Sequence, residues 1–195
     1  MARRSEFERF DRLRRLSKGP YPAFTIRYGR RFLVDYPASA VAWIMVGIAL
    51  VELARYEEAE QAFAKSIELC SPENRHFPLA QMGHLFRESG DYDQAAAWYR
   101  KAIEAVPDDA TPRIFLGAVL AKQGRFHEAE EAHREATRCA EGCIDEAYLN
   151  LGFVLRARER FSEAAECFRE AIRLDPEYQS AHTALRDVER CLKIR

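Results

Sequence analysis

The stretch at residues 77–107, FPLAQMGHLFRESGDYDQAAAWYRKAIEAVP, decides the fold. It predicts a helix, a tight turn at Glu88-Ser89-Gly90-Asp91, and a second helix that opens with Tyr92-Asp93-Gln94-Ala95. This opening, an aromatic residue, any residue, Glu or Gln, and then Ala, occurs four times at spacings of 36, 34 and 35 residues. Its aromatic residues are Tyr56, Tyr92, Phe126 and Phe161. The chain is therefore expected to repeat one helical hairpin.

Three further positions keep the same register in all four copies. A glycine lies nine residues before each aromatic residue, a ring lies seven residues after it, and a small residue lies ten after it. In chain order these are Gly47, Gly83, Gly117 and Gly152; Phe63, Tyr99, His133 and Phe168; and Ser66, Ala102, Ala136 and Ala171. A glycine inside a helix costs about 1 kcal/mol relative to alanine, so its recurrence indicates close helix packing. One hairpin cannot bury its own apolar face, and we therefore expect the hairpins to stack.

On these residues the chain resembles the tetratricopeptide repeat family, over roughly residues 40–176. The second copy fits the family pattern almost completely. In the third copy His133 replaces the usual aromatic residue and Glu141 the closing proline, and in the fourth Glu159 replaces the turn glycine. The resemblance implies an all-α, right-handed superhelical solenoid of helix-turn-helix repeats.

The predicted organisation has three parts. Residues 1–38 form a degenerate N-terminal repeat and cap, with helices at Ser5–Ser17 and Ala23–Val34; Tyr28 stands 35 residues before Phe63. The four clear repeats occupy residues 39–72, 75–107, 109–141 and 144–176. Residues 177–195 form a C-terminal capping helix, whose preceding Asp175-Pro176 is expected to open it.

Composition excludes several classes of protein. Hydrophobic residues make up 48% of the 195, enough for a core, but the longest apolar stretch, residues 40–51, is too short to span a membrane. The N-terminus lacks the apolar core of a signal peptide, so we expect a cytoplasmic location. Five cysteines, an odd number, do not suggest a disulfide framework. Cys139 and Cys143 lack two further ligands for a metal site, and neither a metal nor a cofactor is expected.

No motif indicates catalysis. The short connectors hold no glycine-rich phosphate loop, and no acid-base set is clustered in the sequence. His84 is the most prominent single candidate, but a polar residue on an inner helix face fits a ligand contact or a surface position better than a general base. We therefore expect a protein that is not an enzyme.

The resemblance implies that the first helix of each repeat lines a concave groove, which would be apolar with a basic edge. The residues placed there are Ile44, Ile48, Val51, Phe77, Gln81, His84, Arg87, Ile114, Phe115, Lys122, Leu149, Asn150, Phe153 and Arg156. The Lys-Asn-Arg clamp with which some relatives hold a chaperone's C-terminal carboxylate is absent. Such a groove fits an extended peptide or amphipathic helix of a protein partner, with Arg87, Lys122 and Arg156 facing its carboxylates.

Two alternatives would cover the apolar helix at Ala40–Val51 without a foreign partner. The helix at Ser5–Ser17 could fold over it, or a second copy of the chain could, as a homodimer contact.

The N-terminal residues suggest a different function. Residues 1–31 hold ten Lys or Arg against three acidic residues. A nucleic-acid or anionic-surface binder is the alternative that this charge suggests, although a capping helix with a solvated basic face fits better. The basic residues concerned are Arg3, Arg4, Arg9, Arg12, Arg14, Arg15 and Lys18.

Overall fold

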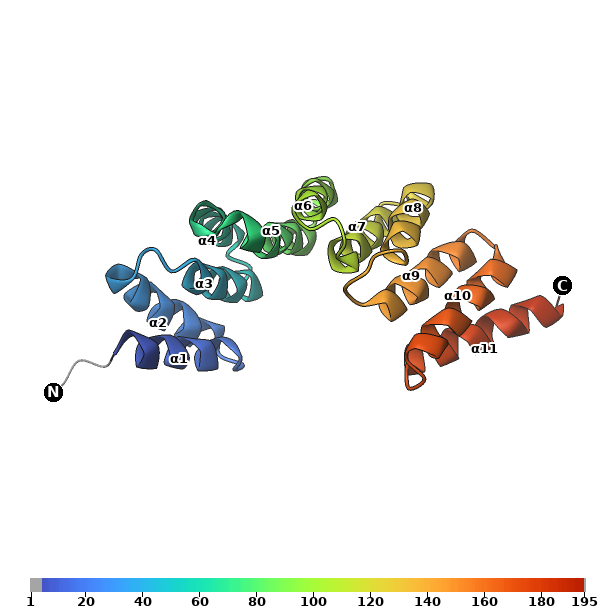
Figure 1. Ribbon diagram of the computed structural model, residues 1–195, viewed down its shortest axis with the longest axis horizontal. Helices are drawn as coiled ribbons and strands as arrows, with labels where there is room; N and C mark the ends of the chain where they lie inside the picture. The colour runs from blue at the N-terminus through green and yellow to red at the C-terminus, as the bar shows by residue number, and fades with distance from the viewer. Residues whose placement is uncertain (1–4, 195) are drawn as a thin grey trace. The chain divides into compact units, whose positions relative to one another are not determined.

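The computed structural model describes residues 5–194, whose helices follow one another in hairpins (Figure 1). They are α1 Glu6–Ser17, α2 Pro22–Asp35, α3 Ala40–Glu52, α4 Tyr56–Leu69, the 3₁₀ helix η1 Pro72–Asn74, α5 His76–Ser89, α6 Tyr92–Ala105, α7 Ala110–Lys122, α8 Phe126–Ala136, α9 Ile144–Ala157, α10 Phe161–Leu174 and α11 Gln179–Ile194. The described residues form no β-strand, only an isolated bridge between Asp109 and Glu141. The all-α fold of stacked helical hairpins is confirmed.

The chain divides into two compact units, residues 1–98 and 99–195, and the division falls inside α6. In the first unit α1 to α5 pack as successive neighbours, and in the second α7 to α11 do so. Each unit has its own hydrophobic core.

In the first unit the N-terminal helices are docked. Ser5 and Glu8 form a reciprocal capping box that starts α1. Leu13 of α1 and Phe32 of α2 are almost fully buried and share a core with Leu50 of α3. The alternative in which the N-terminal helix covers the apolar α3 is thus confirmed for one side of α3.

The register predicted for the N-terminal repeat was wrong by one residue. α1 and α2 begin 34 residues before α3 and α4, so Gly29, and not Tyr28, is the counterpart of Phe63. A Cβ on Gly29 would lie 3.4 Å from Cδ1 of Leu13, which stands 34 residues before Gly47. The terminal repeat therefore reverses the pair, with the large residue on its first helix and the glycine on its second, and periodicity of large residues alone could not reveal this exchange.

The packing role predicted for the recurring glycines is confirmed at three repeats. A Cβ on Gly47 would lie 2.4 Å from the Phe63 ring, and a Cβ on Gly152 would lie 2.4 Å from the Phe168 ring. Gly117 stands in the same relation to His133, at 2.5 Å. The absent side chain lets the ring of the second helix lie directly on the backbone of the first.

The loop that ends the third repeat explains the missing proline. The Glu141 N–H donates to the carbonyl of Asp108 at 3.1 Å, and the Ala110 N–H donates to the carbonyl of Glu141 at 2.9 Å. Proline has no N–H and could not form the first of these bonds. Glu141 thus joins the α8–α9 loop to the start of α7.

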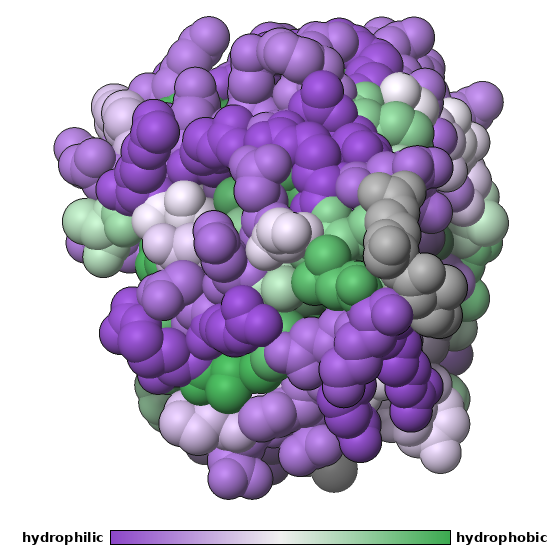
Figure 2. Space-filling model, turned by 90° about the vertical axis from the view of Figure 1, so that its right-hand side faces the viewer, coloured by the Kyte–Doolittle hydropathy of each residue, from purple (hydrophilic) through white to green (hydrophobic). Residues whose placement is uncertain are grey.

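At the C-terminus, α11 begins at Gln179 and not at Asp175 as the sequence suggested. The Asp175 carboxylate accepts the Glu177 N–H at 3.0 Å, an arrangement that holds the preceding turn outside the helix. Ala181, Ala184 and Val188 bury one face of α11 against the second unit. Viewed from the C-terminal side, the surface is mostly hydrophilic with interrupted apolar patches (Figure 2), consistent with a cap.

Candidate functional site

A cleft of about 430 Å³ lies between α3 and α5 in the first unit, and we call it the α3–α5 cleft. It is lined by Ile48, Val51, Glu52, Ala54, Tyr56, Gln81, His84, Arg87 and Glu88. Five of these residues were predicted for the groove from the sequence: Ile48, Val51, Gln81, His84 and Arg87. The structure therefore brings together predicted residues from two separate helices.

Helical spacing places the predicted residues on one face of each helix. Gln81, His84 and Arg87 are separated by three residues each, so α5 presents all three side chains toward the cleft. Ile48 and Val51 do the same on α3, and both are half-buried against the unit's core. The result is an apolar wall from α3 facing a polar wall from α5.

The N-terminus of α4 closes one end of the cleft. The Tyr56 hydroxyl donates to the carbonyl of Glu88 at 3.2 Å, which ties the start of α4 to the last turn of α5. The backbone turns sharply at Ala54, which has a φ of 54°. This end of the cleft is thus held by main-chain geometry and by one side-chain hydrogen bond.

The charges of the cleft are largely balanced. Arg87 pairs with Glu88 at 2.9 Å, and the Arg87 side chain is 31% exposed. Burial lowers the pKa of His84 to about 4; Arg87 also lowers it, whereas Glu88 opposes the shift. His84 is therefore neutral at pH 7 and can serve as a hydrogen-bonding group rather than as a cation.

A second cleft, of about 360 Å³, lies between α9 and α11 in the second unit, and we call it the α9–α11 cleft. Phe153 and Arg156 line it from α9, and α11 supplies Gln179, Ser180, Thr183, Ala184 and Asp187. The guanidinium of Arg156 lies 5.2 Å from the centroid of the Phe153 ring, a cation–π contact. Arg156 and Asp187 give this cleft one charge of each sign.

Three predicted groove residues belong to the core, and for them the prediction was wrong. Ile44, Ile114 and Leu149 are only 6%, 2% and 5% exposed. Their helices have apolar residues on more than one face, so the sequence could not separate the side that packs internally from the side that remains open.

The remaining predicted residues line neither cleft. Phe77 is 48% exposed at the start of α5, and Lys122 is exposed at the end of α7. Phe115 and Asn150 are half-buried, and the Phe115 ring stacks against Tyr99 with centroids 5.7 Å apart. These four residues remain predictions without a cleft.

Sequence reasoning missed the residues that α4 and α11 contribute. Tyr56 was recognised only as a repeat marker, although its hydroxyl reaches α5. α11 begins 35 residues after α9, so it takes the place of the first helix of a further repeat. That spacing was the available signal for a cleft beside α11.

The basic residues of the N-terminus are partly neutralised. Arg3 and Arg4 lie outside the described residues. Arg14 and Arg15 pair with Asp11, at 2.7 and 3.2 Å, and Arg9 pairs with Asp35 at 2.7 Å. The row of free cations that phosphate binding would use is therefore interrupted along α1.

Within residues 5–194, no group of three or more His, Cys, Asp and Glu side chains is arranged to hold a metal ion. No helix in this range is both long and apolar enough to cross a bilayer.

Family models match most of the helical hairpins. One described as "TPR repeat" matches residues 83–124, and two described as "Tetratricopeptide repeat" match residues 40–72 and 108–177. The chain belongs to the tetratricopeptide repeat family. This tetratricopeptide repeat protein keeps the family's hairpin throughout the matched residues and exchanges large and small residues in the repeat that precedes them.

Relatives and solved structures agree with this membership. The chain is 33% identical over 102 residues to anaphase-promoting complex subunit cut9 of Schizosaccharomyces pombe, covering 51% of this chain and 15% of that protein. It is 31% identical over 93 residues to photosystem I assembly protein Ycf3 of a Synechococcus species, covering 47% of this chain and 51% of the relative. The chain thus spans at most about half the length of either relative.

The fold is also similar to that of a solved tetratricopeptide repeat protein. The crystal structure of YrrB, described as having an unusual peptide-binding site, matches with a TM-score of 0.64 at 20% sequence identity. The match covers 92% of this chain and 91% of YrrB. At this identity the likeness concerns the fold alone.

Proposed function

We propose that this tetratricopeptide repeat protein is a non-catalytic interaction module that binds a peptide or an amphipathic helix of a protein partner in the α3–α5 cleft. The observation that carries the proposal is the convergence of Ile48 and Val51 on one wall with Gln81, His84 and Arg87 on the other. An apolar ligand side chain fits against α3, and Gln81 and neutral His84 offer hydrogen bonds to its backbone.

Arg87 gives the ligand its polarity. It is paired with Glu88 at the rim, so a ligand carboxylate would compete for a guanidinium that is already positioned. A ligand with one apolar anchor and a nearby acidic residue satisfies both walls. The α9–α11 cleft, with Phe153 beside Arg156, offers the same combination in the second unit.

The relatives support an adaptor or assembly role. One relative is named as a subunit of a multiprotein complex and another as an assembly protein, and both names describe proteins that work by holding other proteins. We extend that role to this chain as a proposal, together with the cytoplasmic location expected from the sequence. The homodimer remains an alternative for which no observation speaks.

The test is to select binders from a randomised peptide display library with the purified protein and to measure the affinity of the selected peptides. We expect Val51→Asp and Arg87→Glu each to weaken binding about tenfold or more, because each removes one wall's contribution. Arg138→Glu, an exposed substitution in the second unit with the same charge change, serves as the control. Peptides that bind parent, Val51→Asp and Arg87→Glu equally would refute this site.

A further inference from the structure

A separate groove of about 1040 Å³ lies between α1 and α2, at the N-terminal end of the first unit. We call it the end groove. It shares no lining residue with the α3–α5 cleft. A ligand in the end groove would therefore bind independently of a peptide in that cleft.

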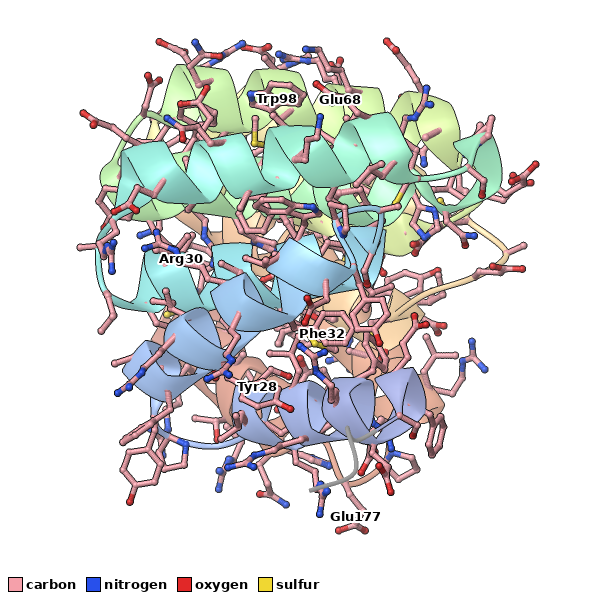
Figure 3. The ribbon with its side chains drawn as sticks, turned by 90° about the vertical axis from the view of Figure 1, so that its left-hand side faces the viewer. Tyr28, Arg30, Phe32, Glu68, Trp98 and Glu177 are labelled. Carbon is pink, nitrogen blue, oxygen red and sulfur yellow. The ribbon has the colours of Figure 1, made fainter. Side chains whose placement is uncertain are left out.

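The end groove exposes large apolar side chains. Phe24 and Val34 of α2 line it and are 57% and 80% exposed. Tyr28 and Phe32 project from α2 toward α1 and form its floor (Figure 3). An apolar stripe of this kind on a helix is typical of a surface that another element covers.

Its unpaired charges are positive. Arg9 is neutralised by Asp35 at 2.7 Å and lies over the Tyr36 ring. Arg12, Arg27 and Arg31 also line the groove, and within residues 5–194 none of the three has a carboxylate partner. The guanidinium of Arg12 lies 5.2 Å from the Tyr28 ring centroid, so its donors are held beside the apolar floor. Glu6 is the one other acidic residue on the lining.

The next hairpin shows what fills such a groove. On α3 the Val46 side chain lies where a Cβ on Gly29 of α2 would be, 2.4 Å away, and Glu58 of α4 pairs with Arg30 of α2. Arg12 and Phe24 stand 34 residues before Val46 and Glu58. The end groove is thus the counterpart of the surface that α2 covers on the following hairpin, and a helix is the element that fits it.

We propose that the end groove binds an amphipathic helix of a partner protein, with an apolar stripe flanked by carboxylates. The stripe covers Phe24 and Val34, and the carboxylates pair with Arg12, Arg27 and Arg31. A second copy fits less well through its C-terminal helix, because α11 exposes the basic residues Arg186, Arg190 and Lys193. Phosphates would satisfy the arginines but leave the apolar stripe exposed.

The experiment uses the full chain and a fluorescently labelled, helix-forming peptide with leucines at helical spacing and glutamates on both sides of them. Two other peptides, one with the same composition in scrambled order and one with lysine in place of glutamate, are measured in parallel. We expect the first peptide to bind and both others to bind about tenfold more weakly or less, by fluorescence anisotropy.

Variants then locate the site. Arg27→Glu with Arg31→Glu is expected to weaken binding about tenfold, and Phe24→Ala to weaken it with little change in salt dependence. The matched control is Arg138→Glu with Arg190→Glu, which changes the same number of charges in the second unit, and circular dichroism monitors folding. Because the substituted side chains are exposed, the fold is expected to persist.

Three outcomes would overturn the proposal. The first is equal binding of the peptide to parent and to Arg27→Glu/Arg31→Glu. The second is dimerisation of the parent that this variant abolishes, which would assign the groove to a second copy. The third is arginine-dependent, steeply salt-sensitive binding of duplex DNA or phosphatidylserine vesicles without binding of the helical peptide.

Discussion

The imidazole of His133 lies against the backbone of Gly117, where the neighbouring repeats place the rings of Phe63 and Phe168. His133 is 1% exposed, and its Nδ1 has no hydrogen-bond partner among the described residues. A polar ring thus occupies an apolar position. An unsatisfied buried polar atom typically costs about 1–3 kcal/mol, so the third repeat contains a removable source of instability.

We therefore expect His133→Phe to raise the free energy of unfolding at pH 7 by about 1–2 kcal/mol. The larger ring fits because Phe63 and Phe168 make the same approach to Gly47 and Gly152. Chemical denaturation followed by circular dichroism measures the change. The reciprocal variant, Phe168→His, is expected to be destabilised. A less stable His133→Phe would contradict the packing equivalence of the repeats.

The same histidine makes stability depend on pH. Burial lowers the pKa of His133 from 6.5 to about 4, so between these values the unfolded chain binds a proton that the folded chain does not. Stability is therefore expected to fall as the pH is lowered from about 6.5 to 4, by on the order of 3 kcal/mol from this residue. Denaturation at a series of pH values should show a flatter profile for His133→Phe. His127→Gln, at an exposed histidine, is the control and should leave the slope unchanged.

Glu159 occupies a turn position in which its φ is 60°, whereas the preceding repeat has Gly124 there with a φ of 75°. A left-handed conformation costs a residue with a side chain about 1 kcal/mol relative to glycine. Glu159→Gly is expected to stabilise the second unit by roughly that amount, and Gly124→Glu to destabilise it similarly. Thermal unfolding of both variants compares them directly. Equal melting temperatures for parent and both variants would show that these turns store no strain.

Glu130 is 4% exposed and is bound by three arginines. Arg134 and Arg160 approach it at 2.7 and 2.8 Å, and Arg158 is also paired with it. Burial raises the pKa of Glu130, but the hydrogen bond from Arg160 and the charges of Arg134 and Arg160 outweigh that effect and hold it below its usual value. The carboxylate therefore stabilises the fold above its unfolded pKa and loses that contribution as the pH falls.

We expect Glu130→Gln to lower the free energy of unfolding by about 1–2 kcal/mol at pH 7. This figure is below that for a fully buried pair because its arginine partners are about one-third exposed and are screened by water. Urea denaturation measures the loss. Glu131→Gln, at an adjacent exposed glutamate, should have little effect. The same loss in both variants would mean that the arginine cluster does not stabilise the unit.

Restoring the family's proline at position 141 is expected to harm this protein. Glu141→Pro removes the N–H that donates to Asp108, at a cost of about 1 kcal/mol, whereas Glu141→Ala keeps the bond. Amide hydrogen exchange at Ala110, whose N–H donates to the carbonyl of residue 141, reports on this loop. Slower exchange at Ala110 in Glu141→Pro than in Glu141→Ala would contradict the structural role of the bridge.

The sequence by itself determined the repeat, the fold class and the helix-to-helix pairing of glycine with a ring, because each of these depends on local spacing of residue types that recurs. It also selected five residues of the α3–α5 cleft, since positions three apart on α5 share a face. The tertiary structure alone decided which side of an apolar helix is open: Ile44 and Ile48 lie one turn apart, yet one is core and the other lines the cleft. It also revealed the reversed Leu13–Gly29 pair and the end groove, because these depend on which helix packs on which, and that choice is made by long-range contacts that local spacing does not encode.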